Sequence, residues 1–163
     1  MTVNDRVEEI YAAERDHIYA YLLYFSVPAG RAQELAQDAF LKLYLKMSKG
    51  ESIENPRAWL YKVAHNSAQR FHQRELVFDE LVGAVDPADR LPDPESAAME
   101  RQRKTALLSA IRDLSPRQRN CLHLRAQGLR HRQIADVIGI STSAATEFLR
   151  RAAVRLKGIM DGY

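Results

Sequence analysis

Residues 115–157 combine helix caps, tight turns and cations in a pattern typical of a DNA-binding helix-turn-helix. The Ser115 hydroxyl can cap a helix, and Pro116 suits the first helical position because its missing N–H would have no partner there. Gly128 can end this first helix in a left-handed conformation, and Gly139 allows a tight turn after a short second helix. The spacing therefore predicts three short helices, the last of which can enter the major groove of DNA.

The third of these helices is expected to begin after a cap at Ser141 or Thr142 and to be amphipathic. Apolar residues at helical spacing predict its inward face, which leaves polar and basic residues outside; they are Ala145, Phe148, Leu149, Ala152 and Leu156. The residues expected to contact DNA from this motif are Arg130, Thr142, Ser143, Thr146, Glu147, Arg150 and Arg151. An ordinary three-helix bundle without DNA shares the apolar periodicity, but it rarely has this Gly-Ile-Ser turn followed by Arg-Arg.

Charge is segregated along the chain and favours the DNA interpretation. Residues 99–163 hold thirteen Lys and Arg against five Asp and Glu, a net charge of +8. Residues 75–98 hold one against seven, a net charge of −6, and residues 1–74 hold ten against nine, a net charge of +1. A concentrated positive field attracts the phosphate backbone. Charges that only solvate helix faces would explain the composition but not its segregation.

A linker is expected at residues 76–97, where Gly83 and three prolines interrupt an acidic run. On either side the apolar residues recur at helical spacing. The sequence therefore predicts an all-α protein with two small helical domains, residues 1–75 and 98–163, joined by an acidic, proline-containing linker. The second domain carries the helix-turn-helix.

Motifs of catalysis and metal binding are absent from the sequence. There is no Gly-rich phosphate loop, no Gly-x-Ser-x-Gly and no His-Glu-x-x-His, and the five histidines are scattered. We expect no catalytic residue, metal or cofactor. Cys121 is the only cysteine, and its apolar neighbours indicate a small buried hydrophobe. No apolar stretch is long enough to span a bilayer and no signal peptide is evident, so we expect a cytoplasmic protein without membrane insertion.

The first domain is expected to contain three helices. An apolar stripe in residues 7–25 is broken at Pro28-Ala29-Gly30, and a second amphipathic helix follows over residues 32–47. Asn55-Pro56 then opens a third helix by a cap and a first-position proline. The third helix is expected to direct Trp59, Leu60, Val63, Ala64 and Ser67 inward and Arg57, Tyr61, Lys62, His65, Asn66 and Arg70 outward.

Three segments, in order, resemble one family over nearly the whole chain. They are Gln-Glu-Leu-Ala-Gln-Asp-Ala-Phe at 33–40, Asn-Pro-Arg-Ala-Trp-Leu-Tyr-Lys-Val-Ala-His-Asn at 55–66, and Leu-Ser-Pro-Arg-Gln-Arg at 114–119 before the helix-turn-helix. With the acidic linker between them, they resemble extracytoplasmic-function sigma factors of bacterial RNA polymerase.

This resemblance implies the partners and the residues that would meet them. The partners are core RNA polymerase and promoter DNA, with an anti-sigma factor as a plausible third. Residues 1–75 would be sigma region 2 and residues 98–163 would be sigma region 4, which reads the minus-thirty-five element. The residues implied in polymerase binding are Leu35, Gln37, Asp38 and Leu41. Those implied in capturing the minus-ten strand are Arg57, Tyr61, Lys62, His65 and Asn66.

The chain also departs from the family pattern. It has His65 where the family often has Arg, and Thr146-Glu147-Phe148 where Lys-Ser-Arg is frequent. Glu147 could accept a hydrogen bond from cytosine N4, and the loss of two cations indicates that the preferred promoter sequence differs from the usual one of the family. The hypothesis is an alternative, non-enzymatic sigma factor. A LuxR-type helix-turn-helix regulator and a purely protein-binding helical adaptor remain as alternatives.

Overall fold

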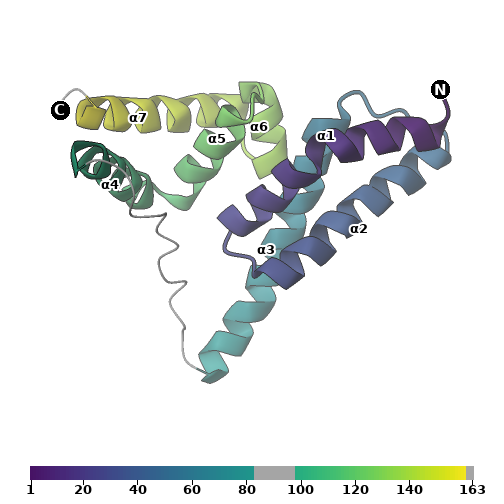
Figure 1. Cartoon of the computed structure of the whole chain (residues 1–163), viewed down its shortest axis with the longest axis horizontal. Coiled ribbons are helices and arrows are strands. Elements are labelled where there is room, and N and C mark those ends of the chain that lie inside the picture. The colour runs from purple at the N-terminus through teal and green to yellow at the C-terminus, as the bar shows by residue number, and fades with distance from the viewer. Residues whose placement is uncertain (83–97, 161–163) are drawn as a thin grey trace. The chain divides into compact units, whose positions relative to one another are not determined.

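Helices are the only regular secondary structure among the residues that the structure describes. This computed structural model describes the backbone of residues 1–82 and 98–160 and the side chains of residues 1–75 and 100–158. Within these ranges the chain forms seven α-helices and no strand (Figure 1). The helices cluster into two compact units, α1 to α3 and α4 to α7. The predicted all-α class with two helical domains is confirmed.

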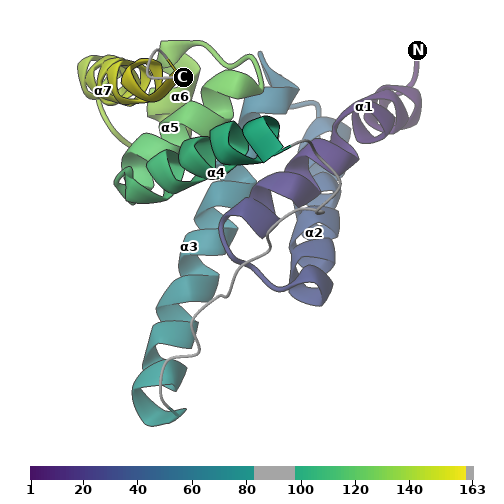
Figure 2. The ribbon, with the colours of Figure 1, turned by 60° about the vertical axis from the view of Figure 1, so that its left-hand side comes forward.

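The first unit is a three-helix bundle. Its helices α1 (Val3–Tyr24), α2 (Ala29–Ser48) and α3 (Pro56–Val82) each pack against the other two (Figure 2). Thr2 and Asp5 form a capping box at the start of α1, in which each side chain accepts the backbone N–H of the other residue. The buried apolar side chains of this unit are Ile18, Tyr21, Leu22, Val27, Ala32, Leu35, Ala36, Ala39, Phe40, Leu43, Leu60, Tyr61, Ala64 and Ala68.

Helix α3 begins where the sequence predicts but ends later. Asn55 Oδ1 accepts the backbone N–H of Ala58 at 3.0 Å, which is the expected cap. The helix then continues to Val82, seven residues into the segment 76–97 that was expected to be linker. The reason is local, because the first glycine or proline of that segment is Gly83 and the residues before it have no helix breaker. The rest of the segment lies outside the described residues.

The second unit contains the predicted helix-turn-helix. Its three helices are α5 (Pro116–Ala126), α6 (His131–Ile138) and α7 (Thr142–Met160). Ser115 caps α5 as expected, and its hydroxyl accepts the N–H of Gln118 at 3.2 Å while the Gln118 side chain accepts the Ser115 N–H at 3.1 Å. The predicted order and approximate bounds of the three helices are confirmed.

Two glycines make the turns between these helices. Gly128 and Gly139 have φ angles of +87° and +81°, which place both in the left-handed region where a Cβ is disfavoured. After the second turn the Ser141 hydroxyl accepts the N–H of Ala144 at 3.1 Å, so Ser141 is the cap that begins α7. The buried apolar side chains of the unit are Ala110, Leu114, Cys121, Leu124, Leu129, Ile134, Ala135, Val137, Ala145, Leu149 and Ala152.

A fourth helix, which is not among those predicted from the sequence, completes the second unit. Helix α4 (Ala98–Asp113) packs on α7. Its last residue, Asp113, lies 3.4 Å from a guanidinium nitrogen of Arg155 in α7. Ala110 and Leu114 are buried at this end of the helix. The helix therefore gains its packing from a partner about forty residues later in the chain.

A pair of alanine substitutions tests the role of the second turn. Gly139→Ala places a Cβ in a left-handed residue and should lower the free energy of unfolding by about 1–2 kcal/mol. Gly158→Ala is the matched control, because Gly158 lies within α7 with open space around its Cβ position. It should raise stability by about 0.5–1 kcal/mol. Urea denaturation followed by circular dichroism measures both, and equal effects of the two substitutions would contradict the turn assignment.

Candidate nucleic-acid interface

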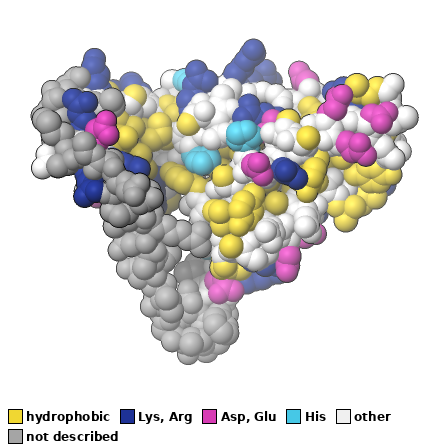
Figure 3. Space-filling model, viewed as in Figure 1, with side chains coloured by type: hydrophobic (Ala, Val, Ile, Leu, Met, Phe, Trp, Pro, Cys, Tyr) yellow, Lys and Arg dark blue, Asp and Glu magenta, His cyan; other side chains and the backbone are white. Residues whose placement is uncertain are grey.

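The outward face of α7 carries the residues predicted to contact a duplex. Ala145, Leu149 and Ala152 are buried, so one face of the helix is packed against the unit and the other remains accessible. Of the predicted set, the exposed residues are Arg130, Thr142, Ser143, Thr146, Arg150 and Arg151, and Glu147 is partly exposed. Lys and Arg side chains gather along this edge of the unit, over α6 and α7 (Figure 3). Their contact with DNA stays a prediction.

A hydrogen bond joins α6 to this face of α7. The His131 Nδ1 atom lies 3.0 Å from the Thr146 hydroxyl, and both residues are at the surface. Arg130 immediately precedes His131 and caps α6, with its own N–H donated to the Gln133 side chain at 2.9 Å. The contact therefore brings the start of α6 and the middle of α7 together, which places Arg130 beside the rest of the predicted set.

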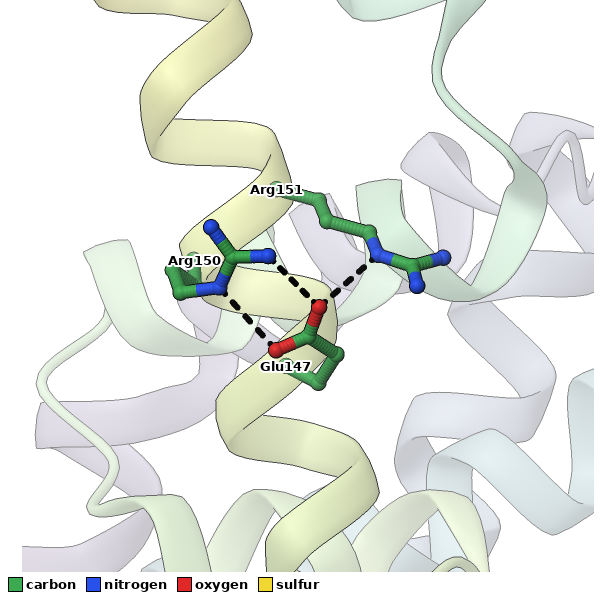
Figure 4. A network of polar contacts seen from close by, with 3 residues as sticks. All are labelled: Glu147, Arg150 and Arg151. Atoms are coloured by element: carbon green, nitrogen blue, oxygen red, sulfur yellow. Dashed lines mark hydrogen bonds and ion pairs between the residues drawn. The ribbon is translucent and has the colours of Figure 1, made fainter.

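Glu147 is bound by both neighbouring arginines on α7 (Figure 4). Arg150 donates from Nε at 3.0 Å and from Nη2 at 2.7 Å, one bond to each carboxylate oxygen. Arg151 donates from Nε at 2.9 Å to the oxygen that already accepts Nη2. The hydrogen bonds from Arg150, followed by that from Arg151, lower the pKa of Glu147 to about 2. The carboxylate is therefore charged at neutral pH, and it holds two guanidinium groups.

Tyr61 and His65 do not lie on the outward face of α3, and the prediction that they do is wrong. Both side chains are buried, with exposed fractions of 0% and 1%. Tyr21 of α1 packs edge-on against the Tyr61 ring. The Tyr21 hydroxyl lies 3.0 Å from His65 Nδ1. The physical reason is that α3 packs on α1 as well as on α2, so it buries a wider face than a single apolar stripe indicates.

The remaining predicted residues of α3 differ in their surroundings. Arg57 donates from Nε to Glu14 of α1 at 3.2 Å, and its guanidinium lies 5.9 Å from the centre of the Tyr61 ring. Asn66 is exposed and Lys62 is partly exposed. Glu14 was not predicted as a partner of Arg57. The signal in the sequence is its place within the apolar stripe of α1, where a carboxylate needs a partner. Arg57 therefore forms an ion pair with α1, and part of its side chain remains accessible to solvent.

Helix α2 presents most of the residues implied in polymerase binding. Gln37, Asp38 and Leu41 are exposed, and 55% of Leu41 is accessible despite its apolar side chain. Leu35 was grouped with them, but only 7% of it is exposed, because it shares the inward stripe of the helix. The structure adds Leu45, which follows Leu41 by one turn and is 48% exposed. An apolar surface on α2 is therefore left without cover in the unit.

A groove of about 480 Å³ lies between α2 and α3. Leu35 and Phe71 contribute apolar lining, and the rest of the groove is polar. The charged residues that line it are Arg31, Asp38, Lys42, Arg70, Arg74 and Glu75. The groove cannot be recognised from the sequence, because its two walls are separated by about thirty residues of chain and each wall alone resembles an ordinary solvated helix face.

The described part of the chain offers no metal site and no reactive thiol. No group of three or more His, Cys, Asp or Glu side chains there could hold a metal ion. Cys121 is buried, and burial raises the pKa of its thiol to about 11, as expected for a packed residue. None of the described helices combines the length and the apolar character needed to cross a membrane.

Comparison with family models finds two matches along the chain. Residues 10–76 match Sigma-70 region 2, and residues 104–156 match Sigma-70, region 4. The first match covers most of α1, all of α2 and most of α3. The second covers most of α4, all of α5 and α6, and most of α7. The two matches thus correspond in order to the two structural units.

Curated relatives and solved structures agree with these matches. The chain is 27% identical to the RNA polymerase sigma factor YlaC of Bacillus subtilis over 161 residues, which is 96% of this chain and 93% of the relative. It is 25% identical to the ECF RNA polymerase sigma factor SigM of the same organism over 160 residues, 95% of each chain. The sigma factor RpoE of Bartonella quintana, solved with the anti-sigma factor NepR, has the same fold, with a TM-score of 0.71 and 20% identity over 94% of this chain and 96% of that chain.

The buried His65 gives the first unit a defined pH dependence. Burial lowers the pKa of His65 from 6.5 to about 4. The unfolded chain therefore takes up a proton near pH 6.5, whereas the folded chain does so only near pH 4. The stability that neutral His65 contributes is complete above pH 6.5 and is lost as the pH falls to about 4, a change of roughly 3 kcal/mol.

Urea unfolding of the wild type and of His65→Phe at pH 4 and pH 7 measures this contribution. The aromatic replacement keeps much of the packing against Tyr21 but does not titrate, so the wild type should lose roughly 3 kcal/mol more than the variant between the two pH values. His17→Phe, at an exposed position, is the control and should follow the wild type. An equal pH dependence of wild type and His65→Phe would contradict the assignment.

Proposed function

The chain belongs to the sigma-70 family of bacterial RNA polymerase sigma factors, as a sigma factor of the extracytoplasmic-function type, and from this membership we propose which of its surfaces meet polymerase and promoter. It is an alternative sigma factor that directs promoter recognition at the start of transcription. The observation that carries this conclusion is the match of both sigma-70 regions, in order, to two separate helical units. The alternative of a LuxR-type regulator has no support, because such a regulator has no sigma-70 region 2.

The outer face of α2 is the proposed polymerase-binding surface. Asp38 supplies charge beside the accessible apolar side chain of Leu41, and Gln37 adjoins them. Desolvated apolar anchors next to charged groups are typical of surfaces that bind a protein partner with specificity. Leu35 is left out of this surface, since its side chain belongs to the core of the first unit.

The accessible side of α3 is the proposed surface for the melted minus-ten strand. Lys62 and Asn66 are spaced by one helical turn and share a face of α3. Arg57 precedes Lys62 by five residues, so it lies on another side of the helix, where it meets Glu14 of α1. A cation and an amide on one helix face can hold phosphates and the edges of unstacked bases. Tyr61 and His65 act in this proposal as the buried support of that face rather than as contacts.

The outward face of α7, with Arg130 beside it, is the proposed surface for the minus-thirty-five element. The helix-turn-helix geometry directs the start of α7 toward the major groove, with polar side chains toward base edges and arginines toward phosphates. The nucleotide chemistry belongs to the polymerase, and the protein acts with it in the cytoplasm. An anti-sigma factor is a further proposed partner, by analogy with the Bartonella quintana structure that contains NepR.

A double substitution on α2 tests the polymerase-binding surface and the proposed function together. Asp38→Arg with Leu41→Ala reverses one charge and removes one apolar anchor without touching the buried stripe. Core polymerase from the organism that encodes the chain should co-purify with tagged wild type and should lose at least tenfold in affinity for the double variant.

The control for this experiment is Glu9→Arg, which reverses the charge of an exposed residue on α1. It should bind polymerase as the wild type does. Circular dichroism checks that helical content is the same in all three proteins. Wild-type affinity in the double variant would refute the α2 assignment, whereas failure of the wild type to bind polymerase at all would refute the proposed function.

A second pair of substitutions tests strand capture by α3. Lys62→Ala and Asn66→Ala should weaken binding of the assembled holoenzyme to a single-stranded oligonucleotide that carries the non-template minus-ten sequence, by roughly 0.5–3 kcal/mol each, the range for the loss of one hydrogen bond to a neutral or charged group. Promoter sequences for this oligonucleotide come from transcripts induced by overexpression. Gln33→Ala on α2 is an exposed control. If the losses appear on duplex promoter but not on the single strand, these residues act before melting and the strand-capture assignment is wrong.

A further inference from the structure

The carboxylate of Glu147 is nearly saturated by arginine hydrogen bonds. One oxygen accepts from both Arg150 and Arg151 and the other accepts from Arg150, so three of about four lone-pair positions are used. A cytosine amino group would have to use the position that remains or displace a guanidinium. The geometry therefore disfavours Glu147 as a direct reader of bases.

The two arginines, in contrast, keep most of their donors. Each guanidinium has five N–H groups, of which Arg150 uses two and Arg151 uses one in binding Glu147. Their side chains are 62% and 60% exposed, so the remaining N–H groups can meet DNA while the bonds to Glu147 persist. The three residues together carry a net charge of +1 rather than the +2 of the arginines alone.

This charge balance affects non-specific and specific DNA binding differently. A phosphate that approaches either arginine is also repelled by the nearby carboxylate of Glu147, so the gain in electrostatic free energy from a random DNA site is small. At the preferred site the guanidinium groups are already oriented by Glu147, which reduces the entropy that they lose on binding. Loss of Glu147 would therefore favour random sites more than the preferred site.

We propose that Glu147 is a specificity-determining residue that acts through Arg150 and Arg151, by orienting their guanidinium groups and by offsetting part of the charge with which they attract DNA phosphates. This inference rests on the proposed function of α7 as the helix that meets the minus-thirty-five element. In this role Glu147 weakens binding to random DNA sites. Its position among base-facing residues does not by itself indicate such a role.

The test measures DNA binding by the full chain, as fluorescence anisotropy over a range of salt concentrations. The two probes are a duplex enriched by the wild type from a randomised pool and a duplex of the same composition with scrambled sequence. Glu147→Gln removes the charge with little change in shape. Glu147→Asp keeps the charge. Glu100→Gln is the matched control, because it removes one exposed negative charge from the same unit, on α4.

Glu147→Gln should bind the scrambled duplex about fivefold more tightly at 0.15 M salt, because one added phosphate contact contributes a salt slope of about 0.9. The slope of log K against log salt should steepen by that amount. The enriched duplex should gain less, so the ratio of the two affinities should fall. Glu147→Asp should keep the wild-type slope, and Glu100→Gln should keep both the slope and the ratio.

Two results would overturn the proposal. One is an unchanged slope and ratio in Glu147→Gln. The other is a new base preference at one position of a randomised pool with unchanged affinity for scrambled DNA, which would make Glu147 a direct reader of bases. If the wild type enriches no sequence from the pool, the proposed function of α7 fails and this inference fails with it. A wild type that enriches a sequence leaves the proposed function standing whatever Glu147→Gln does.

Discussion

Burial of one face of each helix determines which residues this protein can offer to a partner. In α7 the buried stripe of Ala145, Leu149 and Ala152 leaves the opposite face accessible along its whole described length. Helix α2 behaves in the same way, since the stripe that contains Leu35 is buried and Leu41 is exposed. Each proposed interface is therefore the complement of a packing surface. A substitution in a buried stripe would therefore shift the position of the exposed face, although no residue of that face is changed.

In helix α3 the buried face cannot be identified from the apolar stripe alone, and the tertiary structure is needed to define it. It packs against two helices, so its buried face includes Tyr61 and His65 as well as the simple stripe of Leu60 and Ala64. The contact that buries His65 comes from Tyr21, which is 44 residues away in the sequence. The tyrosine hydroxyl and the histidine imidazole are polar, so both residue types suggest a surface position when only their own helix is considered. No pattern within α3 distinguishes the two cases.

The features that the sequence did predict depend on neighbours within about four residues. The caps at Asn55 and Ser115 and the turn at Gly139 are set by local hydrogen bonds and by the backbone freedom of glycine. The same local logic explains the extension of α3 up to Gly83. Helix α4 is different, because it is rich in polar residues and the surface that it covers belongs to α7, which follows it in the chain.

Carboxylate partners of arginine recur on both proposed DNA surfaces, with different physical consequences. The Glu147 carboxylate is exposed, and exposed ion pairs contribute little to stability, so its effect is mainly on the orientation and charge of the arginines. The Glu14 side chain is only 14% exposed, so Arg57 also neutralises a carboxylate that is largely removed from water. Removal of Arg57 would leave that charge without its partner and would destabilise the contact between α1 and α3. Loss of DNA binding in an Arg57 variant would then combine the loss of a DNA contact with the loss of the ion pair. Variants of Lys62 and Asn66 test the accessible face of α3 without breaking this ion pair.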